Sequence, residues 1–452
     1  MLFRSKPPPK LTISEWADEY RKLSPESSAE PGSWNTSRAE YQRGIMDALS
    51  DPYIETVVVM SSAQVGKTEI LNNAVGYFIS QDPSPMLVVQ PTLDMAQTWS
   101  KDRLAPMLRD TPILSGLVKD PRSRDSGNTT LHKVFPGGHV TACGANSPSS
   151  LASRPVRNVF CDEVDRYPVS AGTEGDPVSL AKKRSATFWN RKILLVSTPT
   201  NKDASRIETA YLESDQRKYY VPCPHCHAEQ PLVWGSVKWE IDKPETAMYC
   251  CSECGGMWDD TQRARAIKRG KWVSVEKTRK IAGFHLSALY SPWTPLEDGV
   301  RDFLEAKKQP ATLRVWVNTF LGETWEESGE QVDDFDLANR AEEWHVVPED
   351  VVLLTAGVDV QDDRLEAEIV GWGRDEESWS IAYKTIHGDP SSPAVWRDLD
   401  EFLSQSFEHE VSDDMIVRAT CIDSGGHHTQ AVYKYVAPRE GKRIFAIKGV
   451  GG

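Results

Sequence analysis

The stretch Ser61-Ser-Ala-Gln-Val-Gly-Lys-Thr68 decides the fold of this chain. It follows an apolar run at 56–60, which is typical of a buried strand, and it precedes a helical pattern predicted over 67–80. Apart from Ser61 at its first position, it fits the pattern G-x-x-x-x-G-K-[ST]. Backbone N–H groups and a helix N-terminus in this order cradle phosphates. The stretch therefore predicts a phosphate-binding loop; the alternative is a strand-to-helix turn with an incidental Gly-Lys-Thr.

The same loop predicts how a nucleotide is held. Lys67 would reach the β- and γ-phosphates of ATP, and the Thr68 hydroxyl would hold Mg²⁺. The expected nucleotide-binding residues are Ser62, Ala63, Gln64, Val65, Gly66, Lys67 and Thr68.

A second apolar run, 156–161, ends in two carboxylates, Asp162 and Glu163. In P-loop enzymes such a strand lies beside the strand that leads into the loop. Its Asp reaches the Mg²⁺, and a following Glu orients the attacking water. Alone, Asp-Glu at a strand end is usually a solvated turn. Together with Lys67 the pair predicts ATP hydrolysis, with Lys67, Asp162 and Glu163 as the catalytic group.

Two further features concern the γ-phosphate. The apolar run 192–197 leads into Ser197-Thr-Pro199, a candidate sensor beside the site. The charge on the transferring phosphoryl group also calls for an arginine finger. Arg154, Arg157 and Arg166 flank the acidic strand, and the sequence does not choose among them.

Short apolar runs alternate with helical stretches from residue 54 to about 200. Beside the runs already named, 86–90 reads as a strand, and 93–108 and 178–188 read as helices. Strands that are apolar on both faces and separated by helices indicate a mainly parallel sheet. This region is therefore predicted to be an α/β P-loop ATPase domain, RecA/ASCE-like, with a parallel-rich sheet.

Five of the eight cysteines fall within 223–254. Cys223-Pro-His-Cys226 and Cys251-Ser-Glu-Cys254 are two C-x-x-C knuckles separated by 24 residues. Tetrahedral Zn²⁺ takes four such thiolates as a closed structural site. Cys250 competes with Cys251 for the third position, but only Cys251 keeps the two-residue spacing to Cys254. The predicted Zn²⁺ ligands are Cys223, Cys226, Cys251 and Cys254, in a small zinc ribbon; the alternative is buried free thiols.

The C-terminal part of the chain, from about residue 351, has a different order of predicted strands and helices. Strands predicted at 353–360, 365–372 and 378–386 are separated by short polar turns, and a helix at 394–405 leads to strands at 417–422 and 443–448. This order fits an RNase H-like α/β sheet. Asp359, among apolar neighbours, and Asp423 would then hold a divalent metal for phosphodiester cleavage. The alternative is a hydrogen-bonded turn and a helix cap. His427 and His428 are expected on the surface.

Composition sets outer bounds. A length of 452 residues suggests two to three domains, and a formal net charge of −14 excludes a histone-like coat without excluding a DNA enzyme whose basic groove is local. The densest basic group near the ATPase core is 182–184 with 191–192, a candidate for contact with DNA phosphates or a solvated helix face. No run approaches the roughly 18 apolar residues of a membrane span, and the start lacks a signal-peptide core. A soluble, cytosolic protein is expected.

These elements in this order resemble the large subunit of a tailed-phage terminase, of the lambda gpA-type family. The resemblance covers nearly the whole chain. It rests on Trp16-Ala-Asp18, Ser28-Ala-Glu-Pro-Gly32, Gln64-Val-Gly-Lys-Thr68, Asp162-Glu-Val-Asp165, Ser197-Thr-Pro-Thr200, Gly357-Val-Asp359 and Ile422-Asp-Ser-Gly-Gly426.

The resemblance implies an ATP-driven motor that pumps double-stranded DNA into a procapsid, and a nuclease that cuts concatemers. It implies ATP, Mg²⁺ or Mn²⁺, and Zn²⁺ as cofactors, and a terminase small subunit and a portal protein as partners. A homo-oligomer on the portal and a location in the host cytoplasm, without a membrane, are expected. By the same resemblance Gln42, beside Tyr41, lies near the adenine.

Two departures from the family pattern matter. Ser61 replaces the first glycine of the loop, which the family tolerates. The family nucleases also use an acidic residue on a helix after the last sheet strand, and this sequence stops at Gly452. We therefore expect a C-terminally truncated chain that has Asp359 and Asp423 without the third acid, and weak or absent cleavage.

The predicted division of the chain has five parts: an N-terminal arm and helix (1–50), the ATPase domain (51–215), a zinc-ribbon insertion (216–275), a connector (276–350) and an incomplete nuclease domain (351–452). The connector includes the acidic stretch 323–350. Two other functions stay open at this point. A superfamily 2-like helicase or remodeller would need a second RecA-like lobe, and a DNA-binding adaptor would have decayed sites.

Overall fold

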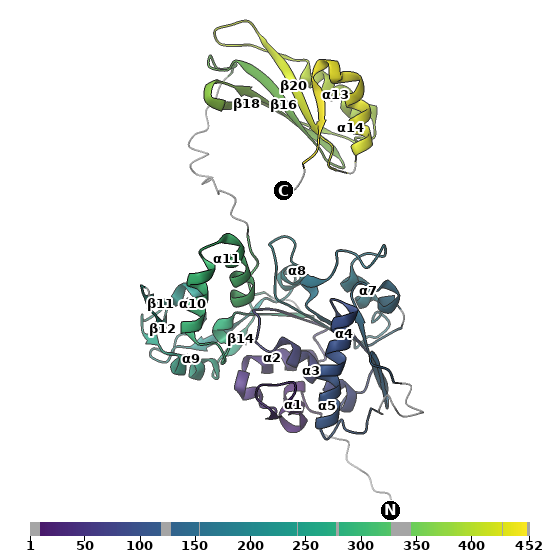
Figure 1. Ribbon diagram of the computed structural model, residues 1–452, viewed down its shortest axis with the longest axis vertical. Helices are drawn as coiled ribbons and strands as arrows, with labels where there is room; N and C mark the ends of the chain where they lie inside the picture. Colours follow the sequence, from purple (N-terminus) through teal and green to yellow (C-terminus); the bar gives the residue numbers. More distant parts are fainter. Residues whose placement is uncertain are drawn as a thin grey trace, which may run out of the picture. The chain divides into compact units, whose positions relative to one another are not determined.

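The computed structural model describes residues 10–118, 128–152, 154–241, 243–276, 280–326, 345–426 and 428–449. The chain divides into two compact units, Met1–Ser328 and Gly329–Gly452, and each is described by itself (Figure 1). Most of the acidic stretch 323–350, and His427, lie outside the described residues. In the described part of the chain, no helix is both long enough and apolar enough to cross a membrane.

The first unit is built on one large sheet with the strand order β10-β9-β15-β3-β8-β7-β4-β6-β5, and β14 pairs with β9. Neighbouring strands from β9 to β6 run parallel, whereas β5, β10 and β14 pair antiparallel at the edges. Their bounds are β3 (Thr56–Ser61), β4 (Met86–Gln90), β5 (His132–Phe135), β6 (Gly138–Gly144), β7 (Asn158–Asp162), β8 (Lys192–Ser197), β9 (Arg217–Pro222), β10 (Glu229–Pro231), β14 (Lys271–Val273) and β15 (Ile281–Leu286).

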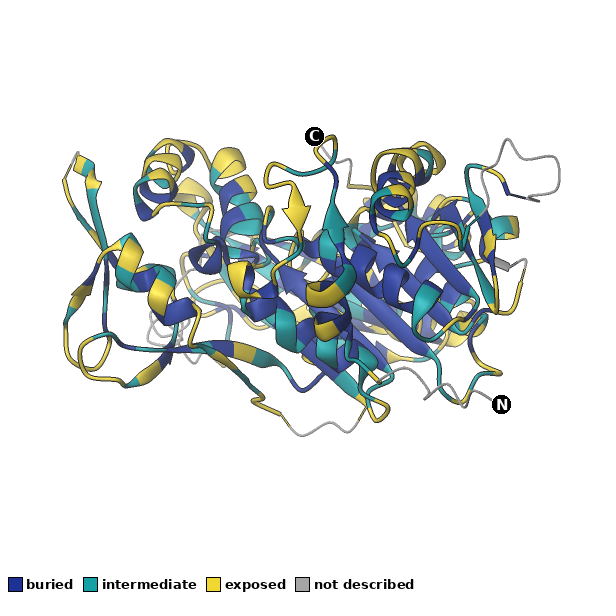
Figure 2. Cartoon of the chain, turned by 90° about the horizontal axis from the view of Figure 1, so that it is seen from below, coloured by how far each residue is buried: buried dark blue, intermediate teal, exposed yellow. Residues whose placement is uncertain are grey.

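The central strands are buried on both faces, as their continuous apolar runs predict. Every residue of β3, β4, β7 and β8 is buried, and they form the dark blue centre of Figure 2. Alternate residues of β3 serve two cores: Val57 and Val59 pack with the helices on one face, and Val58 and Met60 pack with those on the other. The parallel α/β arrangement predicted for this region is confirmed.

Helices cover both faces of this sheet. One core contains residues of α1 (Ile13–Tyr20), α2 (Tyr41–Ser50), α3 (Lys67–Ser80), α4 (Leu93–Trp99) and α5 (Ala105–Asp110); the other contains residues of α6 (Pro148–Ala152), α7 (Pro177–Lys183) and α8 (Arg206–Leu212). The helix α3 matches its predicted bounds. The helix predicted over 93–108 is α4 and α5 joined by a π-helical turn, Ser100–Leu104. A short strand pair, β1 (Lys22–Leu23) and β2 (Gly32–Ser33), lies in the N-terminal arm.

The order of the sheet differs from the sequence prediction at one point. The acidic strand β7 was expected beside the loop strand β3, but β8 lies between them and pairs with both. The hydrophobic pattern marks β7 and β8 alike as buried strands, so it carries no information on which one is the neighbour of β3.

The predicted connector also differs from the structure. The strand β15 falls within 276–350, yet it lies inside the large sheet of the first unit, parallel to β3 from Ile281↔Thr56 to Leu286↔Ser61. It is followed by α10 (Leu296–Ala306) and α11 (Pro310–Trp316), whose residues join the same core. Residues 281–326 therefore belong structurally to the first unit, because their apolar side chains complete its core.

The cysteine segment forms hairpins at the end of the sheet that carries β9. A small sheet of order β11-β12-β13 contains β11 (Val237–Glu240), β12 (Lys243–Cys250) and β13 (Met257–Trp258), and α9 (Asp260–Ile267) follows it. The side chains of Tyr249 and Trp258 pack with ring centres 4.9 Å apart and are fully buried. This ribbon of hairpins is continuous with the core of the first unit.

The second unit is a sheet of order β18-β17-β16-β20-β19, with β21 pairing to β20. Its elements are β16 (Leu353–Val360), β17 (Arg364–Trp372), β18 (Ser378–His387), α13 (Pro393–Leu403), β19 (Ser406–Phe407), β20 (Met415–Asp423), α14 (Thr429–Val436) and β21 (Ile444–Ile447). The strands β16, β17 and β18 form an antiparallel meander, and β20 runs parallel to β16 and β21. One sheet face packs on α13 and α14, so the predicted mixed α/β sheet is confirmed.

Candidate functional site

The loop between β3 and α3 has the backbone geometry of a phosphate cradle. Gly66 has φ +85°, and a Cβ there would lie 2.2 Å from Nε2 of Gln42, so glycine is required. The Val65 carbonyl accepts hydrogen bonds from the Tyr41 hydroxyl (3.2 Å) and from Gln42 Nε2 (3.0 Å). Gln64 has φ +59° without being glycine, a strained conformation typical of functional loops. The helix α2 thus holds the loop in an open shape.

The start of the loop is tied to the segment after β15. The backbone N–H of Ser62 donates to Leu286 O at 2.8 Å, and that of Ala63 donates to Thr319 O at 2.8 Å. Gly322 has φ +67°, and a Cβ there would lie 2.5 Å from Ser62 N. Ser61 is still the last residue of β3 in extended backbone, which explains why this position does not need the usual glycine.

Lys67 contacts the ends of two other strands. Its Nζ lies 3.2 Å from Oε1 of Glu163 and donates a hydrogen bond to the Thr198 hydroxyl. Burial lowers the pKa of Lys67, and the charge of Glu163 opposes that shift. The Ser-Thr-Pro strand end therefore lies beside the lysine. Because β8 lies between β3 and β7, Thr198 follows the strand between the two strands that lead to Lys67 and to the acidic pair.

The two carboxylates after β7 have different surroundings. Asp162 is buried; its Oδ2 accepts from Gln90 Nε2 at 3.1 Å, and its Oδ1 has no partner among the described residues. Burial, and then the charge of Glu163, raise the pKa of Asp162 to about 6. Glu163 has φ +53° and one oxygen on Lys67, while its Oε2 accepts no hydrogen bond from the described residues. The buried Oδ1 of Asp162, which has no partner among the described residues, could therefore act as a ligand of a divalent cation beside the phosphate loop.

A cavity of about 970 Å³ joins these groups. Its lining includes the loop residues Ala63, Gln64, Gly66, Lys67 and Thr68 together with Gln42, Glu163 and Thr198, and also Glu30, Arg38 and Trp293. This size suits a nucleotide. Of the predicted nucleotide-binding residues, Ser62 and Val65 do not line the cavity and serve the loop through their backbone bonds.

The structure separates the three arginine candidates. Arg157 pairs with Asp82 and lies over the ring of Phe78. Arg154 contacts His132 at 3.3 Å. Arg166 lines the nucleotide cavity, and its Nε lies 3.7 Å from Oε2 of Glu163. Of the three, Arg166 is the one placed beside the reacting groups within this chain.

Part of the predicted basic group is not free to contact DNA. Lys192 is buried and donates to the carbonyl oxygens of Asp51 and Ile54, and Arg191 pairs with Glu55 at 2.8 Å. Both residues hold the entry to β3 and β8. The stretch 182–184 at the end of α7 is what remains of that group.

The four predicted zinc ligands converge. The Sγ atoms of Cys223, Cys226, Cys251 and Cys254 all lie within 4.8 Å of one another. Cys250 lies outside the cluster, with its Sγ 3.7 Å from the carbonyl oxygens of Cys251 and Gly255. Gln230 Nε2 donates to Cys251 Sγ at 3.1 Å, which supports a thiolate. Four convergent sulfurs fit a closed tetrahedral Zn²⁺ site.

The acids of the second unit are placed differently from expectation. Asp359 was expected among apolar neighbours, but its side chain is exposed, because the buried face of β16 carries Val358 and Val360. Its Oδ2 accepts from Gln361 Nε2, and Asp423 Oδ1 accepts from Gly425 N at 3.0 Å. The parallel register pairs Val358 with Ile422, so Asp359 and Asp423 follow it on adjacent strands. The two acids share one edge of the sheet.

Sequence reasoning missed several residues of the ATPase site. Gln90 supports Asp162, and its place as a polar residue at the end of a predicted parallel strand was an available signal. Thr319 and Gly322 contact the loop from about 260 residues away in sequence, and no local pattern indicates that contact.

Comparisons with known proteins cover both units. Residues 28–272 match the family described as phage terminase large subunit gpA, ATPase domain, and residues 281–452 match terminase large subunit gpA, endonuclease domain. The chain is 32% identical to the terminase large subunit of Enterobacteria phage P21 over 473 residues, which covers 98% of this chain and 73% of that protein. It is 32% identical to that of Escherichia phage lambda over 477 residues, covering 99% and 73%. The solved HK97 bacteriophage large terminase shares the fold, with a TM-score of 0.53 at 10% identity, covering 98% of this chain and 85% of that chain.

The buried Asp162 makes stability depend on pH. Because its pKa is raised from 3.8 to about 6, the folded state binds this proton more tightly than the unfolded chain. The free energy of unfolding therefore falls as the pH rises from about 4 to about 6. Above that range the buried carboxylate is ionised and destabilises the folded state by its full amount. Without nucleotide or divalent metal, Asp162→Asn is expected to raise the melting temperature at pH 7.5, equivalent to about 1–3 kcal/mol, and to leave it nearly unchanged at pH 4.

The matched control for this measurement is Asp302→Asn, at an exposed position on α10. It is expected to change the melting temperature little at either pH. If Asp162→Asn raises the melting temperature as much at pH 4 as at pH 7.5, the raised pKa of Asp162 is contradicted.

Proposed function

Because the chain belongs to the family of phage terminase large subunits of the gpA type, we propose that Lys67, Glu163 and Thr198 form the site whose ATP hydrolysis drives double-stranded DNA into a procapsid. Members of this family are DNA-packaging motors with an ATPase and an endonuclease domain. The observation that carries the residue assignment is the convergence of these three side chains on one cavity beside the phosphate loop.

In this proposal each residue has one task. The loop amides and Lys67 bind the β- and γ-phosphates, for which Lys67 exchanges its contacts with Glu163 and Thr198. Glu163, released from the lysine, orients the attacking water and takes up its proton. Thr198 contacts the γ-phosphate end, and Arg166 is the arginine finger within the chain, stabilising the charge on the transferring group. Gln42 holds the loop and lines the cavity where the nucleoside enters.

Thr68 and Asp162 would hold Mg²⁺ with the nucleotide. The unpartnered Oδ1 of Asp162 supports this fit. When bound, the cation neutralises phosphate charge. It also gives the buried Asp162 carboxylate an opposite charge, which favours its ionised form.

In the second unit, Asp359 and Asp423 are proposed as metal-holding acids of the nuclease. They follow a paired position on adjacent parallel strands and are accessible on one sheet edge. Mg²⁺ or Mn²⁺ there would stabilise the charge on the phosphodiester during in-line attack. Exposure of Asp359 suits this role, since DNA and metal must both reach it.

The cysteine cluster is proposed to hold Zn²⁺ as a structural ion. Four thiolates leave no coordination position for a substrate. The bound ion would fix the hairpins 223–226 and 251–254 to each other. Both strands that flank the first knuckle, β9 and β10, belong to the large sheet, so the ion would stabilise that end of the ATPase unit.

The proposed partners are double-stranded DNA, a terminase small subunit, the portal protein and further copies of this chain, in the host cytoplasm. Lys182 and Lys183 are proposed to contact DNA phosphates. The helicase alternative lacks support, because the described residues after 216 in the first unit extend the existing sheet and its flanking hairpins and form no second RecA-like lobe. The adaptor alternative lacks support because the nucleotide site is complete in its side chains.

The ATPase assignment predicts two separable defects. Lys67→Ala should abolish both ATP binding and turnover, whereas Glu163→Gln should keep ATP binding and lose roughly a hundredfold or more in kcat. Turnover is measured with and without duplex DNA, and Glu213→Gln, an exposed acid on the same unit, serves as control. Turnover that DNA does not stimulate favours the adaptor; ATP-driven strand separation favours the helicase.

The nuclease assignment predicts loss of cleavage from either acid. The nicking of supercoiled plasmid by this chain in Mn²⁺, expected to be weak, should fall to background for Asp359→Asn and for Asp423→Asn, and EDTA should stop it in the wild type. Asp413→Asn, exposed and away from the paired strand ends, should nick like the wild type. If nicking survives both Asp359→Asn and Asp423→Asn, these two residues are not the metal-holding acids.

The zinc assignment predicts a difference between neighbouring cysteines. Elemental analysis of the purified chain should find about one Zn²⁺ per chain. Cys251→Ser should lose the ion and lower the melting temperature, whereas Cys250→Ser should keep both, because Cys250 Sγ lies outside the cluster. Zn²⁺ retained by Cys251→Ser and lost by Cys250→Ser would reverse the ligand assignment.

A further inference from the structure

The lining of the nucleotide cavity also contains an aromatic and charged cluster, Glu30, Arg38 and Trp293, that the phosphate chemistry does not use. Trp293 Nε1 donates to Glu30 Oε1 at 3.1 Å, and Arg38 donates to both Glu30 oxygens at 2.9 to 3.2 Å. The Arg38 guanidinium carbon lies 5.6 Å from the centre of the Trp293 ring. All three side chains line the cavity, and Trp293 remains 43% exposed.

The loop that carries Trp293 is held from behind by Arg263 of α9. Arg263 is buried; Nη1 donates to Leu289 O and Nη2 to Thr294 O, each at 2.7 Å, on either side of the tryptophan. Asp260 pairs with Arg263 at 2.7 Å and accepts from Leu296 N. The indole is therefore positioned before any ligand arrives, which reduces the entropy lost on binding.

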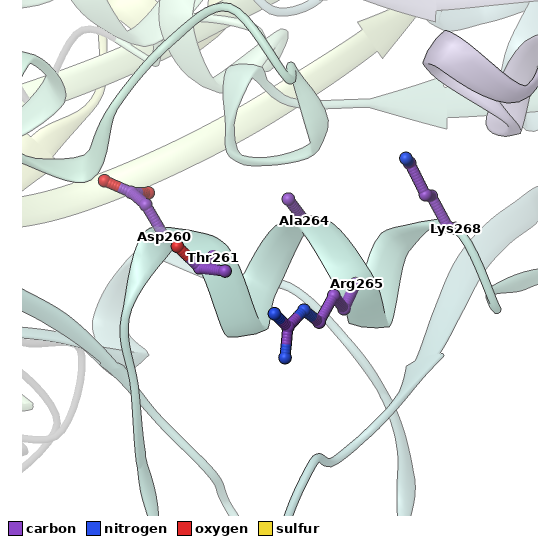
Figure 3. Close-up of a pocket in the computed structure, with 5 residues that line it drawn as sticks. All are labelled: Asp260, Thr261, Ala264, Arg265 and Lys268. Atoms are coloured by element: carbon purple, nitrogen blue, oxygen red, sulfur yellow. The ribbon is translucent and has the colours of Figure 1, made fainter.

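A separate cavity of about 390 Å³ is lined by Asp260, Thr261, Ala264 and Arg265 of α9 and by Lys268, which follows it, and its lining does not include Arg263 (Figure 3). Arg265 is exposed. The helix thus offers a buried arginine that supports the Trp293 loop and an exposed arginine that does not, two residues apart.

The residues that line the nucleotide cavity fall into two chemical groups. Lys67, Thr68 and the loop amides suit phosphates. In the other group, the negative charge of Glu30 is paired with Arg38, whose guanidinium lies over the Trp293 ring, and Trp293 remains partly exposed. Indole and guanidinium planes are surfaces on which nucleobases stack. A ligand whose phosphates bind the loop therefore has a base-stacking side chain within the same cavity.

We propose that Trp293 is a specificity-determining residue that stacks on the base of the bound nucleotide, with Arg38 and Glu30 as positioning residues for its indole. The ligand class is a purine nucleoside diphosphate or triphosphate, whose two-ring base covers the indole better than a pyrimidine does. This inference rests on the proposed nucleotide site around Lys67, and it adds the residue that reads the base.

The test compares a nucleotide with a polyphosphate that has no nucleoside. ADP and inorganic tripolyphosphate are titrated into the full chain, and the steady-state constants for ATP are measured. Trp293→Ala should raise the Kd of ADP and the KM of ATP about tenfold and leave kcat within about twofold. Its affinity for tripolyphosphate should stay within about twofold of wild type, because that ligand reaches only the loop. Trp293→Phe should give values of the ADP Kd and the ATP KM between those of the wild type and of Trp293→Ala.

The controls separate stacking from a distorted fold. Trp189→Ala removes a tryptophan that is 90% exposed and does not line the cavity, so ADP affinity should not change. Arg263→Lys should lower the affinity for ADP and leave the affinity for tripolyphosphate unchanged. Arg265→Ala should change neither affinity.

Two results overturn the inference: ADP affinity unchanged in Trp293→Ala, or equal losses for ADP and tripolyphosphate. A failure of the nucleotide site itself looks different. In that case Lys67→Ala leaves the affinity for both ligands unchanged.

Discussion

The buried ion pair between Lys67 and Glu163, with Nζ 3.2 Å from Oε1, is the interaction on which the ATPase unit depends. A lysine that is 7% exposed is tolerated only where an acid or a ligand phosphate compensates its charge. Lys67 comes after β3 and Glu163 after β7, and these strands are not neighbours, since β8 lies between them. The ion pair therefore requires the ends of β3 and β7 to lie on the same side of the sheet, where the nucleotide site is proposed.

A second constraint concerns residues 281–326, which return to the sheet after the cysteine hairpins. β15 runs beside β3, and two carbonyl oxygens, of Leu286 at the end of β15 and of Thr319 after it, accept hydrogen bonds from the first N–H groups of the phosphate loop. The same segment pairs Trp325 with the backbone beyond β8, through Thr200 and Lys202. The loop and the Thr198 strand end are thus joined by one piece of chain.

Features that depend on residues close together in the sequence could be predicted, and features that depend on contacts between distant segments could not. The phosphate loop, the acidic strand end and the cysteine knuckles are contiguous motifs, and each appears in the structure with the expected residues facing one another. The central strands and the meander were predicted because burial imposes a period on the sequence. Asp359 was misjudged for the same reason: apolar neighbours along a strand alternate between faces, so they describe the other side of the sheet.

The sequence by itself determined the α/β class of the first unit, the loop that cradles phosphates, and the identity of the four convergent cysteines, because each depends on spacing along the chain. Tertiary structure alone decided the order of β3, β8 and β7, the return of β15 into the sheet, and which of the three arginines, Arg166, lies beside Glu163. It also decided the meeting of Glu30, Arg38 and Trp293, which lie up to 263 positions apart. Such contacts arise from packing between distant segments, and no local pattern of residues encodes them.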